Sequence, residues 1–153
     1  MENISQLVMQ FRNAIESAQQ NGETDKLEFF KRFPRGCCGN ASNFLGHFLL
    51  KNGIETCYIW GSCHTSNIEE SSQTHAWLLL DDDTIIDITG DQFKDKPHFL
   101  NYSRPVYIGK TDEFHKLFNC ETRNKRKSFP IEELYTMDSQ MFSEMYNQII
   151  KYL

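Results

Sequence analysis

Hydrophobic residues recur every three or four positions near both ends of the chain and in one central stretch, the spacing of one helix face. The polar run at residues 19–23, Pro34 and the pair Asn52-Gly53 are signals that end helices. Together they predict helices at residues 4–20, 24–32 and 38–52. A closing helix is predicted at residues 129–153, with Pro130 in its first turn, and a break near residues 136–139 is compatible with the pattern.

Between these helices the pattern changes to short runs that are rich in β-branched and aromatic residues. Strands are predicted at residues 54–61, 74–80, 84–89 and 104–109. Three consecutive aspartates at residues 81–83 predict the tight turn of a hairpin, and the polar stretch at residues 62–74 is expected to form the rim or lid of a site. The fold class is therefore α+β, with a central helix packed on a small antiparallel sheet and helices at both ends.

Composition and charge narrow the class of protein. A chain of 153 residues, 39% hydrophobic and 24% charged, suits a single globular domain, residues 1–153. The net charge is -5 and the one basic run, residues 123–128, is expected to be a solvated loop, so we expect no nucleic-acid binding.

The N-terminal sequence and the cysteine content indicate the cellular compartment. The first twenty residues resemble neither a secretory signal nor a membrane anchor, and no apolar run reaches membrane-spanning length. Five cysteines make an odd count without a spaced framework, which favours reduced thiols. We therefore expect a soluble cytoplasmic protein that does not bind membranes.

Candidate chemistry centres on Cys38, at the start of the central helix. A helix N-terminus lowers the pKa of a thiol, and the flanking Gly36 and Gly39 let backbone N–H groups approach a substrate carbonyl. His75 begins one predicted strand and Asp87 lies on the next, so adjacent antiparallel strands would place them side by side. In that geometry we expect the carboxylate to receive the Nδ1 proton of the histidine. The sequence thus predicts a Cys-His-Asp triad.

Two longer stretches extend this pattern: "GCCGNASNFLGHFLLKNGIETCYIWG" and "HAWLLLDDDTIIDIT". Together they resemble the catalytic core of the transglutaminase-like division of the papain-like cysteine enzymes. The resemblance covers residues 33–93, and its spacing selects Cys38 over Cys37, because Ser42, Gly53-Ile54 and Gly61 then match without a gap. The more compact bacterial relatives that cleave leader peptides from modified peptides share this short core.

The resemblance implies a thiol-dependent hydrolase, either a peptidase or an amidase, that forms an acyl-enzyme on Cys38 and needs no cofactor. The substrate would be a peptide or another amide, and transfer of the acyl group to an amine would use the same residues. Gly39, Trp60 and Trp77 are expected at the substrate site, although either tryptophan could instead fill the core. Candidate oxyanion donors, by residue type alone, are Gln19, Gln20 and Asn21.

Two other readings remain open. A metal site would use residues from the set Cys37, Cys38, Cys63, His64 and His75, although adjacent cysteines on a helix start converge poorly on one ion. A non-enzymatic binding, adaptor or immunity protein, with a protein partner, could keep the same fold.

The other histidines and residues 91–93 are expected to have structural roles. His47 is expected to be exposed or at the edge of the core, and His98 and His115 lie in stretches with no supporting partner. Residues 91–93 are expected to turn the chain and to pack Phe93 beneath the site.

Overall fold

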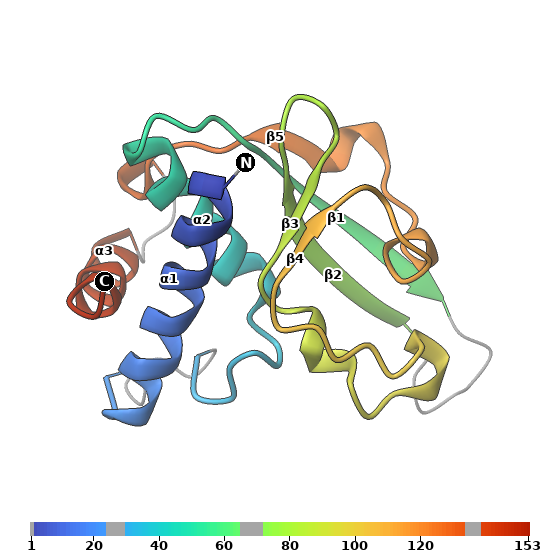
Figure 1. Ribbon diagram of the computed structural model, residues 1–153, viewed down its shortest axis with the longest axis horizontal. Coiled ribbons are helices and arrows are strands. Elements are labelled where there is room, and N and C mark those ends of the chain that lie inside the picture. The colour runs from blue at the N-terminus through green and yellow to red at the C-terminus, as the bar shows by residue number, and fades with distance from the viewer. Residues whose placement is uncertain (1, 24–29, 65–71, 134–138) are drawn as a thin grey trace.

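The computed structural model describes residues 2–23, 30–64, 72–133 and 139–153 (Figure 1). Its α-helices are α1 (Glu2–Gln20), α2 (Cys38–Lys51) and α3 (Ser139–Ile150). Its strands are β1 (Cys57–His64), β2 (Ser72–Leu79), β3 (Ile85–Asp87), β4 (Tyr107–Gly109) and β5 (Lys125–Lys127). Short 3-10 helices lie at Gly90–Phe93, Pro97–Phe99, His115–Leu117, Thr122–Asn124 and Ile131–Glu133. The α+β class is confirmed, and Figure 1 shows the three α-helices grouped on one side of the sheet.

The central helix α2 forms as its sequence predicts. Its apolar stripe is buried, and Phe48 stacks on Phe11 of α1 with the ring centroids 5.0 Å apart. Gly53 ends the helix with a positive φ of 76°, which allows the N–H of Ile54 to reach the carbonyl of Leu49 at 2.9 Å. Full burial of each large apolar side chain in this stripe contributes about 1.5–3 kcal/mol to the free energy of unfolding. This helix therefore holds Cys38, its first residue, in a fixed place.

The five strands form one antiparallel sheet in the order β4-β3-β2-β1-β5. The predicted hairpin turn is confirmed: the N–H of Leu80 donates to the carbonyl of Thr84 at 2.9 Å, and Asp83 has a φ of 60°. The short β3 pairs with β2 only at Leu78 and Leu79. The part of β2 that precedes Trp77 therefore has an edge that β3 does not cover.

Both faces of the sheet are buried. On the helix side, Leu78 and Ile86 join the core formed by α1, α2 and α3. On the other side, Trp77 packs in a second core that is mostly aromatic, with Phe93, Phe99, Phe114 and Phe118. Side chains alternate between these faces along a strand, so His75 points to the same side as Trp77. The aromatic core thus forms the floor beneath His75.

The structure differs from the sequence-based expectation in the basic run. The expected solvated loop contains β5, whose Lys125, Arg126 and Lys127 pair with β1 at the edge of the sheet. Arg126 lies over the Tyr58 ring at 4.3 Å and donates a hydrogen bond to Asn43 at 2.6 Å. Packing of its guanidinium on an aromatic ring, which the charge pattern does not reveal, accounts for the strand.

The ends of several predicted elements also differ. The closing helix is shorter than predicted, because Ile131–Glu133 form a 3-10 turn and α3 begins at Ser139. Residues 30–32 form turns, whereas the rest of the short helix predicted at 24–32 lies outside the described residues. The strands β1 and β2 extend into both ends of the predicted rim at 62–74, and residues 65–71 lie outside the described part, as does most of the predicted break near 136–139. None of the described helices has the length and apolar character that crossing a membrane requires.

Candidate active site

Cys38 and Cys37 occupy very different surroundings although they are adjacent. Cys37 precedes α2, is 1% exposed, and its thiol donates to the Pro34 carbonyl at 3.3 Å. Burial raises the pKa of Cys37 to about 12. Cys38 is only partly buried and lines a cavity of about 620 Å³. Cys38 therefore borders the cleft, whereas Cys37 is packed, which agrees with the choice of Cys38 as the candidate nucleophile.

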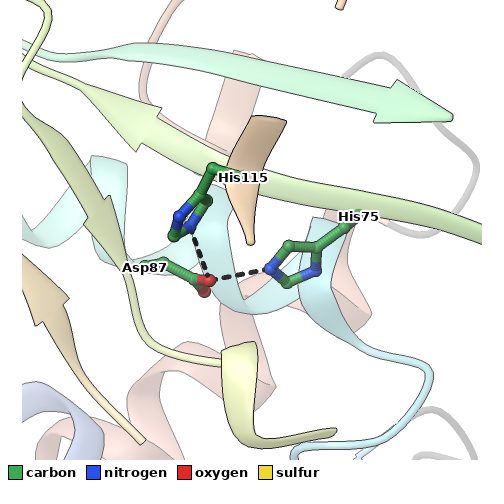
Figure 2. Close-up of side chains that lie close together, drawn as sticks. All are labelled: His75, Asp87 and His115. Atoms are coloured by element: carbon green, nitrogen blue, oxygen red, sulfur yellow. Dashed lines mark hydrogen bonds and ion pairs between the residues drawn. The ribbon is translucent and has the colours of Figure 1, made fainter. Parts of the chain in front are cut away.

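His75 of β2 and Asp87 of β3 are in contact in the buried interior of the sheet. The Nε2 of His75 lies 2.7 Å from the Oδ2 of Asp87, and both side chains are at most 1% exposed (Figure 2). Extending the pairing of Leu78 with Ile86 places Asp87 opposite Trp77, two residues from His75 on the same face. The predicted neighbours meet for this reason.

The structure corrects one detail of the prediction. Asp87 contacts Nε2 of His75, not Nδ1 as expected from the sequence. The strand direction and the χ angles of the histidine decide which nitrogen turns inward, and a residue pattern does not encode them. Because Nε2 faces the carboxylate, Nδ1 is the nitrogen left to exchange a proton with the Cys38 thiol, with which the imidazole shares a hydrogen bond.

The protonation equilibria of these three groups are displaced in the direction of an ion pair. Burial alone would raise the pKa of Cys38, but the hydrogen bond and charge of His75 outweigh it and hold the pKa below its usual value. Burial would lower the pKa of His75, but the charge and hydrogen bond of Asp87 raise it. Burial would raise the pKa of Asp87, yet the histidine charge and hydrogen bonds hold it well below its usual range. Such opposed shifts favour a thiolate beside an imidazolium.

A glutamine that the sequence reading treated as part of a turn is the fourth polar group at the site. Gln92 lies in the 3-10 helix directly after β3, and its Nε2 is 3.0 Å from the Nδ1 of His75. The turn is anchored by Arg12 of α1, which makes two hydrogen bonds, at 2.9 and 3.0 Å, to the carboxylate of Asp91. In the sequence, the one hint of a role for Gln92 is its position five residues after Asp87. The geometry of the turn brings its side chain back to Nδ1 of His75. Phe93 does pack beneath the site, 5.2 Å from the His75 ring between centroids.

Open space lies on two sides of Cys38. The cavity of about 620 Å³ is polar and includes Arg35, Gln92 and Lys96 in its lining. The other, of about 320 Å³, is lined by Gly39, Tyr58 and Trp60, and both cavities include Cys38 and Thr74. The nucleophile candidate thus lies at the junction of a polar and an aromatic cavity.

The expected substrate-binding residues separate into two groups. Gly39 and Trp60 line the aromatic cavity, and Trp60 is 39% exposed. Trp77 is 4% exposed and packs against the far side of His75, so it belongs to the core.

The candidate oxyanion donors chosen by residue type lie elsewhere. The side chain of Gln19 donates to the Lys31 carbonyl at 3.0 Å and that of Asn21 to the Ser17 carbonyl at 2.8 Å. Neither these residues nor Gln20 line the two cavities beside Cys38.

The structure overturns the expectation that His115 has no supporting partner. Its Nε2 lies 3.2 Å from the Oδ2 of Asp87 and its Nδ1 lies 2.6 Å from the Oδ1 of Asp112 (Figure 2). His47 is also more buried than expected, at 1% exposure, and its Nδ1 accepts the backbone N–H of Ile131 at 3.1 Å. His98 is exposed, as a residue outside the site would be, with its ring against Phe99. His47 was missed because its partner, Ile131, is 84 residues away, whereas His115 has one distant partner, Asp87, and one local partner, Asp112, that the sequence interpretation overlooked.

Possible metal ligands converge at one place in the described part of the chain. Atoms of His75, Asp87 and His115 lie within 4.8 Å of one another, whereas of the five residues in the alternative metal site only His75 belongs to this group. Imidazole and carboxylate are ligands that zinc accepts. The distances of 2.7 and 3.2 Å are nevertheless those of hydrogen bonds, which account for the cluster without an ion.

Comparison with known proteins found no relative. No family model matches the chain, and no curated protein or solved structure is significantly similar to it.

Proposed function

We propose that the protein is a thiol-dependent hydrolase, a peptidase or amidase, in which Cys38, His75 and Asp87 form the catalytic triad. The observation that supports the proposal most is the continuous chain of contacts from a cleft-facing thiol through a buried imidazole to a buried carboxylate. Burying an uncompensated charge costs free energy, and the pairing of Asp87 with His75 offsets that cost for both buried side chains. The resemblance of residues 33–93 to the transglutaminase-like and papain-like enzymes agrees with this assignment.

In the proposed reaction, Cys38 transfers its proton to Nδ1 of His75 and the thiolate sulfur attacks the carbonyl carbon of an amide. The C=O electron pair moves to oxygen, and the tetrahedral adduct collapses as His75 returns the proton to the leaving amine. Water then adds to the thioester with His75 as base, which releases the acid and restores the thiol. An amine in place of water would give acyl transfer. Asp87 holds the Nε2 proton throughout and stabilises the imidazolium.

The site also offers donors for the oxyanion. The backbone N–H groups in the first turn of α2, including that of Cys38, have no carbonyl of the preceding turn to bind. The side-chain Nε2 of Gln92 lies 3.0 Å from Nδ1 of His75 and has no acceptor there while Nδ1 carries the proton taken from Cys38. Gln92 is then placed to donate to the developing oxyanion instead.

The two cavities favour an extended substrate that crosses the thiol. A peptide or substituted amide would place its apolar group against Trp60 and a polar segment toward Arg35 and Lys96. The sequence of residues 33–93 resembles the short core of the compact bacterial leader peptidases, and we propose cleavage of a peptide in the cytoplasm on that basis.

The proposal is tested by the alkylation rate of Cys38 with iodoacetamide from pH 5 to pH 9, read by peptide mass spectrometry. We expect native Cys38 to react already near pH 6 and to lose that reactivity in His75→Ala, whereas Cys37 serves as an internal control that does not react. Reaction only near the free-thiol pKa of about 8.5 would contradict an activated pair.

A second measurement tests acyl transfer itself. A reactive ester such as p-nitrophenyl acetate should acetylate Cys38, with a burst of p-nitrophenol, in the native protein but not in Cys38→Ala. Activation of the thiol without any acylation would instead favour a catalytically silent binding or adaptor protein.

A further inference from the structure

The polar cavity beside Cys38 has an excess of positive charge. The charged side chains in its lining are Arg35, Asp95 and Lys96, and the other lining residues besides the cysteine are uncharged. The aromatic cavity on the other side of the thiol has no lysine, arginine or carboxylate among the described residues that line it. Two cations and one carboxylate therefore lie on one side of the thiol, in a chain whose net charge is -5.

The backbone of Lys96 is fixed by the turn that follows the 3-10 helix at Gly90–Phe93. Its N–H donates to the carbonyl of Phe93 at 3.0 Å, and its carbonyl accepts the N–H groups of Phe99 at 2.9 Å and Asn101 at 3.1 Å. Lys96 is half-buried, and its Nζ lies 5.5 Å from the centroid of the Phe93 ring. The same ring contacts that of His75, with the centroids 5.2 Å apart. The ammonium thus packs on the phenylalanine that supports the proposed general base.

The charge of Lys96 is not paired within the described part of the chain. Its Nζ donates to a neutral acceptor, the side-chain oxygen of Gln73, at 3.4 Å. No carboxylate of the described residues forms an ion pair with it. A half-buried ammonium with one long hydrogen bond gains free energy from a charged acceptor, because charge-assisted hydrogen bonds are stronger than those to a neutral amide.

Arg35 is the second cation, and Asp95 offsets its charge only in part. The Nη2 of Arg35 lies 3.2 Å from the Oδ2 of Asp95, and the two side chains are 59% and 70% exposed. An exposed pair of this kind contributes little to stability. A guanidinium has five N–H donors, and Asp95 accepts from one nitrogen of Arg35, so other donors remain for a second carboxylate.

We propose that the polar cavity is a subsite for a carboxylate of the substrate, with Lys96 as the main specificity-determining residue and Arg35 as the second cation. This proposal deepens the proposed function and rests on it for the role of Cys38 as the attacking atom. The substrate class is then a peptide or other amide with a negative charge near the scissile bond, on an acidic side chain or at a free C-terminus. The amide of Gln73 and the hydroxyl of Thr74 line the same cavity and supply further donors.

The test labels Cys38 with two pairs of chloroacetyl probes, each pair differing mainly in one charge. The first pair is the α-amides of chloroacetyl-glutamate and chloroacetyl-glutamine, and the second is chloroacetyl-alanine and its amide. In each case the thiolate sulfur displaces chloride from the CH₂ group and forms a thioether, which peptide mass spectrometry quantifies. The first pair reports an acidic side chain as ligand, and the second reports a free C-terminal carboxylate.

We expect the anionic member of at least one pair to label native Cys38 about five-fold faster than its neutral partner, after division by the same ratio for N-acetylcysteine. Five-fold corresponds to about 1 kcal/mol, the upper end of what a partly exposed charge pair contributes. The preference should shrink between about 20 mM and about 500 mM sodium chloride, because added ions screen such charges. Equal corrected rates within both pairs overturn the proposal.

Three variants assign the preference to named charges. Lys96→Met keeps an apolar stem beside Phe93 and should abolish the preference. Lys94→Met makes the same change at an exposed position outside the cavity lining and should keep it. Asp95→Asn removes the carboxylate from the lining and should increase the preference, a change of sign that a general loss of stability does not produce. A preference that survives in Lys96→Met overturns the assignment to Lys96.

The readout separates this subsite from the proposed hydrolase activity. Both ratios are also measured at pH 9, where a thiol with an ordinary pKa of about 8.5 is mostly ionised, so they do not require an activated Cys38. The iodoacetamide profile near pH 6 tests the triad alone. An activated Cys38 without a charge preference would refute the subsite and leave the triad standing, and a charge preference without activation would do the reverse.

Discussion

Replacing Asp87 with asparagine tests the proposed site most directly, because the side chain keeps its shape and loses only its charge. The carbonyl oxygen of the asparagine can still accept from Thr89, as Oδ1 does now at 2.8 Å. Its NH₂ group would then face the Nε2 atoms of His75 and His115, which are now donors at 2.7 and 3.2 Å. His75 would have to give up its Nε2 proton and adopt the other tautomer. An imidazolium at this position is then no longer stabilised.

The magnitude follows from the burial of the pair. Removing one partner of a buried ion pair costs about 3–5 kcal/mol of stability, which for a domain of this size lowers the melting temperature by about 6–20 °C. Without the imidazolium, Cys38 is expected to titrate as a free thiol does, near pH 8.5 or above, so about 1% of it is ionised at pH 6.5. The alkylation rate of Cys38 at pH 6.5 should therefore fall about 100-fold.

The assay compares native protein, Asp87→Asn and Asp82→Asn by iodoacetamide labelling at pH 6.5 and 15 °C, after tryptophan fluorescence has shown that each variant is folded. Asp82 is 65% exposed and pairs with Lys110, so the same substitution there should change neither the labelling rate nor the fold. A folded Asp87→Asn protein whose Cys38 still labels at the native rate would refute the role of Asp87. Loss of labelling in both variants would mean that the assay reports a general loss of stability.

Three further perturbations have defined outcomes. Gly90→Ala places a methyl group 2.7 Å from a ring carbon of Tyr102 and 3.0 Å from the Oδ2 of Asp87. Overpacking of this kind lowers stability by about 1–3 kcal/mol, which urea unfolding measures. Because Asp87 must shift, the substitution should also slow Cys38 labelling. Cys37→Ala should leave the pH profile of Cys38 labelling unchanged while lowering stability by about 1 kcal/mol, and a shifted profile would contradict the assignment of the nucleophile. Folding lowers the pKa of Asp87 through the histidine charge and hydrogen bonds despite burial. The Asp87 carboxylate therefore binds a proton more tightly in the unfolded chain than in the folded one. Stability from Asp87 is therefore present above about pH 4 and lost as the pH falls below it, and urea midpoints between pH 2.5 and pH 5 should drop more steeply for the native protein than for Asp87→Asn.

Much of the local structure follows from the chain alone, because it depends on neighbours in sequence. The apolar spacing after Cys38 and the Gly53 stop define α2, and the aspartates at 81–83 define the turn that joins β2 to β3. Once that hairpin is predicted, the alternation of side chains puts His75 and Asp87 on one face. These are short-range constraints, and local propensity is sufficient to express them.

The tertiary structure decides what depends on contacts between distant segments. It turns Nε2 of His75, not Nδ1, toward Asp87; it brings Gln92 back to the imidazole by anchoring the turn on Arg12; and it buries His115 beside Asp87 from 28 residues away. Trp60 and Trp77 look equivalent in the sequence, yet one lines a cavity and the other fills the aromatic core. A residue pattern records which side chains are available along one element. Which of them share a buried proton network is fixed only when the second face of the sheet is covered, because burial makes each polar group find a partner.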